Sequence, residues 1–246
     1  MFEVGDLVKV IHPLMDINLC AGSHHTVHKI NSSAEYVRID NGYWVRASRF
    51  KLVKGITKPF VVILNAPPQA GKDTVAARLK TKYGYNHCEM KRKLFDLALT
   101  IHSISKEDWD AHYTSELKEK PWDALGGVSP RQALIDISEK VIKPFYGQDY
   151  FAKSAIKQLL PGVNVFSDGG FITETSLLSE AAGEGRCILI RIHREGKTFD
   201  GDSRSYLYPE DIKCVDVYNN STPGALVSTI KDIIDKELAC LKQETK

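Results

Sequence analysis

The sequence lacks several features that would place it in whole classes of protein. No stretch reaches the roughly 20 consecutive apolar residues of a membrane-spanning helix. The N-terminal segment MFEVGDLVKV has no basic lead before an apolar core, so we expect no signal peptide. The five cysteines are scattered without a C-x-x-C pair, which predicts free thiols and a cytoplasmic location. The net charge of +2 requires no polyanionic partner, although a local pocket can still be basic.

What is present falls into two parts. Residues 2–53 contain short runs of alternating apolar and polar residues, which predict β-strands, and Asn41-Gly42 is a hairpin signal. The opening GDLVKV and the closing WVRASRFKLV resemble SH3-like barrels. Gly55–Pro59 looks like a linker. We therefore expect a small all-β barrel over residues 1–55 and a second domain over residues 60–246.

The second part changes pattern. Phe60–Leu64 is an unbroken apolar run, typical of a parallel strand that is buried on both faces. Strands and helices then alternate, which predicts an α/β fold with a parallel sheet flanked by helices. The expected helices are 74–83, 91–102, 129–142, 150–160 and 223–241, and the expected further strands are 163–167, 188–192 and 215–218.

A Gly-Lys pair follows the first buried strand and precedes a helix. This is the setting of a phosphate-binding P-loop, in which backbone N–H groups and the helix dipole attract phosphate oxygens. Gly71 allows close backbone approach, and Lys72 can reach the outer phosphates of a nucleotide. A strand–turn–helix joint with a chance Gly-Lys pair is the alternative. The candidate phosphate-binding residues are Ala66, Pro68, Gln69, Ala70, Gly71, Lys72, Asp73 and Thr74.

The loop departs from the pattern G-x-x-x-x-G-K-[ST]. Ala66 replaces the first glycine and Asp73 replaces the hydroxyl residue, which arrives one position later as Thr74. This Gly-Lys-x-Thr order resembles nucleoside monophosphate kinases of the adenylate kinase type, which share a proline at the position of Pro68. ATP and Mg²⁺ are the implied cofactors, with Asp73, Thr74 and Asp168 as the candidate metal ligands.

Further segments agree in order with one family. GKDT at 71–74, SPRQAL at 129–134, GQDYFAK at 147–153, VFSD at 165–168 with Glu174 downstream, RIHREG at 191–196 and the late VDVYNN resemble bacteriophage deoxynucleoside monophosphate kinases. The resemblance runs from about Phe60 to the C-terminus. It implies ATP-dependent phosphorylation of (deoxy)nucleoside 5′-monophosphates to diphosphates, supporting nucleotide supply for DNA synthesis.

The resemblance also implies residue roles. Asp168 follows a buried strand, where it would hold Mg²⁺ through water. Arg131 would grip the acceptor monophosphate, and Arg194 would close over the transferring group. Arg191 alternates with apolar neighbours, which is compatible with a side chain that faces solvent. The basic cluster 91–93 fits a solvated turn and a phosphate site equally well.

One departure concerns the position two residues after Asp168. The family commonly has an arginine there, whereas this chain has Gly169-Gly170. Either acceptor binding differs or another arginine substitutes. Two other functions therefore stay open: a kinase for another small acceptor such as dephospho-coenzyme A, and a non-catalytic nucleotide-binding module. A homodimer and a protein partner for the barrel also stay open, and no membrane is expected.

Overall fold

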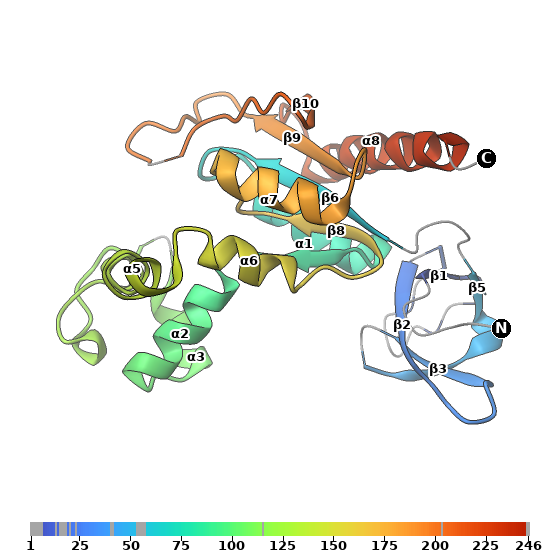
Figure 1. The fold of residues 1–246 in the computed structure, drawn as a ribbon, viewed down its shortest axis with the longest axis horizontal. Coiled ribbons are helices and arrows are strands. Elements are labelled where there is room, and N and C mark those ends of the chain that lie inside the picture. Colours follow the sequence, from blue (N-terminus) through green and yellow to red (C-terminus); the bar gives the residue numbers. More distant parts are fainter. Residues whose placement is uncertain are drawn as a thin grey trace. The chain divides into compact units, whose positions relative to one another are not determined.

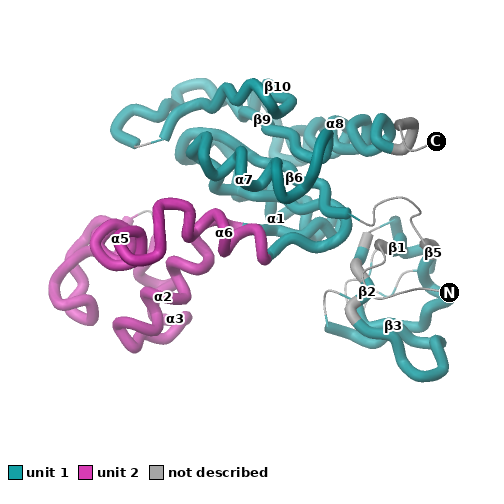
Figure 2. Tube along the Cα trace, viewed as in Figure 1, with its two compact units in different colours: residues 1–88, 158–246 teal, residues 89–157 magenta. Residues whose placement is uncertain are grey.

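The computed structural model describes residues 7–12, 14, 19, 21–22, 24–39, 42–52, 58–114, 116–202 and 204–244. The chain forms two compact units, coloured separately in Figure 2. One unit contains residues 1–88 and 158–246, and the other contains residues 89–157. No helix in the described ranges is long and apolar enough to cross a membrane.

The N-terminal strands form a five-stranded antiparallel sheet in the order β4-β3-β2-β1-β5. Gly42 has a φ of 84° and its N–H bonds the carbonyl of Ile39, so the predicted hairpin turn joins β3 to β4. Alternate residues build a small core around Val8, Val27 and Val37. Of the predicted strand 2–11, residues 7–10 form β1 and Ile11 lies beyond its end, while residues 2–6 lie outside the described residues. The strands are β1 (Leu7–Val10), β2 (His24–Ile30), β3 (Tyr36–Ile39), β4 (Trp44–Arg46) and β5 (Phe50–Leu52).

A second sheet is fully parallel, as the apolar runs predict. Its order is β10-β9-β6-β8-β7, with β6 at the centre between β9 and β8. Six of the seven residues of β6 are buried, because helices cover both faces of this strand. The strands are β6 (Pro59–Asn65), β7 (Asn86–Cys88), β8 (Gly162–Phe166), β9 (Cys187–His193) and β10 (Lys213–Tyr218).

Helices pack on the sheet by their apolar sides. On one face, α1 (Lys72–Tyr83) and α8 (Pro223–Glu244) share a core with Phe60, Val62 and Leu64 of β6. Helix α7 (Ile172–Ala182) contacts β6 and β9 (Figure 1). Successive side chains of a strand point to opposite faces, so this arrangement gives β6 two buried faces.

The other unit is helical. It contains α2 (Arg92–His102), α3 (Lys106–His112), α4 (Pro130–Asp136), a π-helical turn over Ile137–Ile142, α5 (Lys143–Tyr146) and α6 (Tyr150–Ile156). Ser129 caps α4 by accepting from the N–H of Gln132, and Pro130 occupies the first turn, as predicted. Trp109 is 1% exposed and stacks on Tyr113 within the core, so these aromatic side chains pack the unit.

Several boundaries differ from the sequence prediction. Helix α1 begins at Lys72, two residues before the predicted start. Helix α6 ends at Ile156 instead of continuing to residue 160, because the buried Asn164 side chain exchanges two hydrogen bonds with the backbone of Leu160. The sequence pattern did not predict β7, α3 or α7. Strand β7 has only three residues and contains no apolar run that would predict a strand.

Candidate functional site

The predicted phosphate loop connects the carboxyl end of β6 to helix α1. Gln69 has a φ of 61° and Gly71 a φ of 107°, so two loop residues adopt the left-handed conformation. Alternation of right- and left-handed residues turns successive N–H groups toward one concavity, which suits an anion. Gly71 is the N-cap of α1 and supplies no side-chain cap. The first-turn N–H groups of α1 therefore have no side-chain cap competing for them.

Contacts from distant segments hold this loop. Arg194 donates a hydrogen bond from Nη1 to the carbonyl of Gln69 at 2.9 Å, and Lys197 donates from Nζ to Oε1 of Gln69 at 2.6 Å. Asn219 donates from Nδ2 to the carbonyl of Ala70 at 2.9 Å. A non-glycine residue with positive φ is strained, and such strain persists where surrounding contacts fix it. These three side chains fix the strained turn at Gln69.

Asn219 gives the late VDVYNN segment a structural role that the sequence did not suggest. Its backbone N–H also bonds the carbonyl of His193, which links the ends of β10 and β9. A Cβ at Gly71 would lie 2.9 Å from Nδ2 of Asn219. The glycine is therefore required both by its φ and by the neighbouring amide.

The lysine of the loop lies at the start of α1. The Lys72 side chain is 9% exposed, and its Nζ lies 3.7 Å from Oδ2 of Asp73, whose side chain is 67% exposed. Thr74 is also exposed. The Asp73 carboxylate provides an oxygen atom near this buried ammonium, and the oxygen atoms of a bound phosphate would add to it. The arrangement thus brings together the lysine, the carboxylate and the hydroxyl that the sequence placed in this loop.

Asp168 follows the carboxyl end of β8, the strand beside β6. The two strands are parallel neighbours, so this end of β8 and the phosphate loop lie at the same edge of the sheet. Mg²⁺ is commonly held by one or two carboxylates together with substrate phosphates. Asp73, Thr74 and Asp168 supply hard oxygen ligands of that kind, so they fit Mg²⁺ bound with a nucleotide. The described residues contain no cluster of three or more histidine, cysteine or acidic side chains suited to a metal.

Asn65, the last residue of β6, joins three segments at this edge. Its buried side chain donates to the carbonyls of Gly169, at 3.3 Å, and Ser205, at 3.1 Å. It also accepts from the N–H of Leu207 at 3.1 Å. The candidate site residues from the sequence do not include Asn65. A polar residue at the end of an apolar strand is a sequence feature that could have indicated a role at this edge. Asn65 fixes the loop after β8 against the segment around residues 204–207.

The Gly169-Gly170 pair has a steric cause. A Cβ at Gly169 would lie 2.4 Å from Cγ2 of Ile63, and one at Gly170 would lie 2.3 Å from Cδ of Arg204. Both distances are too short for real contacts, so neither position accepts a side chain without rearrangement. The space that a side chain at position 170 would fill is occupied by an arginine from elsewhere in the chain.

Arg191 does not face solvent, which corrects the sequence interpretation. It is 8% exposed and donates from Nε and Nη2 to the two carboxylate oxygens of Asp216, at 2.8 and 2.7 Å. Its Nη1 donates to the carbonyl of Leu207. The Arg191 hydrogen bonds lower the pKa of Asp216 to about 2, and a contact from His193 acts in the same direction. The pair packs β9 against β10, so Arg191 has a structural role.

Arg131 lies in the helical unit, in the first turn of α4. Its Nη1 pairs with Oε1 of Glu119 at 3.3 Å, and its side chain is 39% exposed. Lys91, from the basic cluster that precedes α2, pairs with Glu89 at 3.4 Å. Both cations are partly accessible, and a surface ion pair costs little to exchange for a phosphate. Lys91 also lies over the ring of Phe95, with its Nζ 5.5 Å from the ring centroid.

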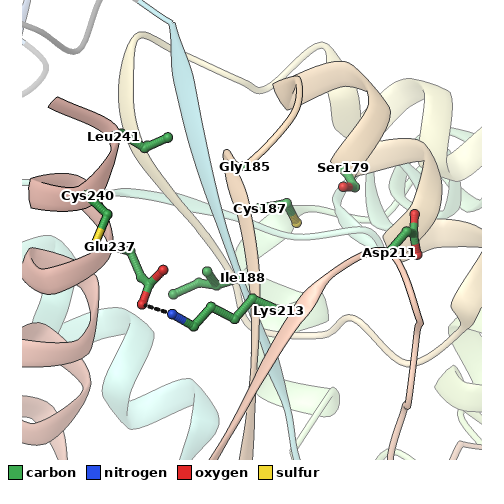
Figure 3. Close-up of a pocket in the computed structure, with 9 residues that line it drawn as sticks. All are labelled: Ser179, Gly185, Cys187, Ile188, Asp211, Lys213, Glu237, Cys240 and Leu241. Carbon is green, nitrogen blue, oxygen red and sulfur yellow. Dashed lines mark hydrogen bonds and ion pairs between the residues drawn. The ribbon is translucent and has the colours of Figure 1, made fainter. Parts of the chain in front are cut away.

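A separate pocket lies at the amino ends of β9 and β10 (Figure 3). Cys187 and Lys213, which begin β9 and β10, contribute to its lining, and Lys213 pairs with Glu237 at 2.6 Å. Burial raises the pKa of the Cys187 thiol to about 12, which keeps it protonated and weakly nucleophilic. The phosphate loop follows a carboxyl strand end, so this pocket is not part of the phosphate site.

Comparisons with known proteins give structural likeness only. No protein-family model matches the sequence, and no curated protein matches it. A gluconokinase from Sinorhizobium meliloti 1021 is similar in structure, with 13% identity, 75% of this chain and 93% of that chain covered, and a TM-score of 0.35. Shikimate kinase from Aquifex aeolicus is similar with 10% identity, coverage of 71% and 96%, and a TM-score of 0.33. At such TM-scores the likeness carries no argument about activity, and the case for one rests on the loop after β6.

Proposed function

We propose that this chain is a P-loop kinase that transfers the γ-phosphoryl group of ATP to a (deoxy)nucleoside 5′-monophosphate. The observation that carries the proposal is the loop between β6 and α1. Its left-handed residues Gln69 and Gly71, the uncapped start of α1 and the buried Lys72 combine the three features of a nucleotide phosphate site. Cytoplasmic nucleotide supply for DNA synthesis is the corresponding role.

The donor half of the reaction follows from these groups. Loop N–H groups and Lys72 would bind the outer phosphates of ATP, and Arg194, already bonded to Gln69, would cover them. Mg²⁺, held by Thr74 with Asp73 and Asp168, would neutralise phosphate charge. Phosphoryl transfer needs no covalent enzyme intermediate, so positioning and charge neutralisation supply the catalysis.

The acceptor half is assigned to the helical unit. Arg131, at the start of α4, has a planar guanidinium that suits the two oxygens of a monophosphate. Its surface pair with Glu119 would exchange for that phosphate. The resemblance to bacteriophage deoxynucleoside monophosphate kinases supports this choice of acceptor over dephospho-coenzyme A. The N-terminal sheet is proposed as an SH3-like accessory module that contacts a protein partner.

The test compares Lys72→Ala with Lys80→Ala, a matched change of an exposed lysine on the same helix. Lys72→Ala should abolish ADP release in a coupled assay with monophosphates and weaken ATP binding in calorimetry. Lys80→Ala should match the wild type in both. Near wild-type turnover by a folded Lys72→Ala variant would refute the phosphate-loop assignment. ATP binding without ADP release for any monophosphate would instead favour the non-catalytic module.

A further inference from the structure

Arg204 lies across the backbone that follows Asp168. A Cβ at Gly170 would meet the arginine stem at Cδ, 2.3 Å away, and at Cγ, 2.7 Å away. Gly170 is buried under this contact. The aliphatic part of the Arg204 side chain therefore passes over Gly170, two residues after Asp168, beyond the carboxyl end of β8.

A carboxylate fixes the orientation of this guanidinium. Arg204 donates from Nε to Oδ1 of Asp202 at 2.8 Å and from Nη2 to Oδ2 at 2.6 Å. Its backbone N–H donates to the same Oδ1. The Asp202 side chain is only 7% exposed, so the carboxylate of this pair is largely shielded from solvent. Asn65 fixes the following backbone through Ser205 and Leu207.

The Asp202 pair uses Nε and Nη2 of the Arg204 guanidinium and leaves Nη1 on the other edge. An arginine has five N–H donors, and the bidentate pair occupies one edge of the plane. Among the residues that the structure describes, no group accepts from Nη1 of Arg204. Its side chain is 26% exposed, so this edge is within reach of a ligand.

Two acids of the phosphate site act on the same guanidinium. The hydrogen bonds to Asp202 raise the pKa of Arg204 most, and the charges of Asp202, Asp168 and Asp73 raise it further, against the effect of burial. Asp73 follows the P-loop lysine, and Asp168 ends β8. The charges of both candidate Mg²⁺ ligands, Asp73 and Asp168, thus act on Arg204.

We propose that Arg204 is a phosphate-binding residue of this site, with Asp202 and Gly170 as its positioning residues. This inference rests on the proposed function and adds to Arg194 a second arginine that contacts the phosphates. The Nη1 edge donates hydrogen bonds to a phosphoryl oxygen while Asp202 holds the other edge. Arg204 stays protonated and forms no covalent bond. Gly170 is required because any side chain there would displace the arginine stem.

The first test measures binding of inorganic pyrophosphate and of ADP by calorimetry, with and without Mg²⁺. Arg204→Ala should weaken both at least ten-fold, and Arg204→Lys should recover part of the loss because it keeps a positive charge. Arg78→Ala, a change of an exposed arginine on α1, serves as the control and should bind like the wild type. Wild-type affinity for both ligands in folded Arg204→Ala, or binding of neither ligand by the wild type, would overturn the proposal.

The second test separates positioning from loop stability. Gly170→Ala should weaken pyrophosphate binding on its own, but it should add no further loss in an Arg204→Ala background, since the clashing stem is gone. Asp202→Asn should lower turnover and leave the melting temperature close to that of the wild type. Additive losses in the double variant would contradict the proposed contact. A wild type that binds ADP yet phosphorylates no monophosphate would refute the proposed function while leaving the role of Arg204 to be decided by binding.

Discussion

Single residues at the ends of the parallel strands decide the chemistry available to this chain. Asn65 ends the otherwise apolar strand β6, and Arg191 lies between two isoleucines of β9. Each is buried and forms hydrogen bonds inside the protein. A buried polar group without partners costs about 1–3 kcal/mol, so such residues persist where the fold supplies partners. Asn65 orders the edge that carries Asp168 and Arg204. Arg191 joins β9 to β10 through Asp216.

The Asp216 pair gives a pH-dependent prediction. The pKa of the Asp216 carboxyl group is lowered from 3.8 to about 2 in the folded protein, chiefly by the Arg191 hydrogen bonds. A lowered folded-state pKa contributes stability above the unfolded value, and that contribution is lost as the pH falls from about 4 toward 2. Asp216→Asn should therefore destabilise the protein clearly at pH 7.

Urea unfolding at pH 7 and at several values below pH 4 measures this effect. The gap between wild type and Asp216→Asn should narrow as the pH falls. Asp232→Asn, a change of an exposed acid on α8, is the control and should leave stability unchanged at each pH. A gap that stays constant down to pH 2 would show that the carboxylate charge contributes nothing.

At the scale of elements, the start of α1 is the feature that most depends on backbone geometry. Helices α3 and α4 are capped by Ser105 and Ser129, whereas α1 begins at Gly71 with a φ of 107° and no side-chain cap. Gly71→Ala should weaken ATP binding at least ten-fold, about 1.4 kcal/mol. Both the positive φ and the nearby Nδ2 of Asn219 oppose a Cβ there.

Calorimetric titration of ATP into the folded variant measures this loss. Gly224→Ala in α8 is the matched control, because a Cβ there meets only Oγ1 of Thr222 at an ordinary 3.8 Å. That variant should bind ATP like the wild type. Equal binding by Gly71→Ala would mean that the loop backbone does not approach the phosphates closely.

The elements also show what the sequence could and could not predict. The strand β6, the start of α4 and the loop at Gly71-Lys72 were predictable, because apolar runs, caps and glycines act over short distances. The contact of Arg204 with Gly170 was not, since two residues far apart in the chain meet only after the sheet forms. For the same reason the sequence showed Gly169-Gly170 as a missing arginine, whereas the structure shows an arginine from another segment over that backbone.

For the molecule as a whole, the residues proposed to bind the two substrates belong to different compact units. The unit with the parallel sheet carries Lys72, Asp168 and Arg194, and the helical unit, residues 89–157, carries Arg131. If Arg131 binds the acceptor phosphate, Arg131→Ala should raise the Michaelis constant for the monophosphate at least ten-fold and leave that for ATP nearly unchanged.

Steady-state kinetics with each substrate varied in turn measure this split. Glu119→Ala is the control, because it removes the ion-pair partner of Arg131 and keeps the guanidinium. It should not raise the Michaelis constant for the monophosphate. Equal effects of Arg131→Ala on both substrates would move acceptor binding elsewhere, with the basic residues Lys91 and Lys93 as the next candidates.

Following the γ-phosphoryl group of ATP tests whether this chain is a nucleoside monophosphate kinase. ATP labelled at the γ-phosphate is incubated with the full chain, Mg²⁺ and each common ribo- and deoxyribonucleoside 5′-monophosphate in turn, and the products are separated by chromatography. We expect the label to appear in at least one nucleoside diphosphate, faster than in inorganic phosphate, and we expect Lys72→Ala to abolish this transfer. Label that stays in ATP, or appears only in inorganic phosphate with every monophosphate, would contradict the proposed function.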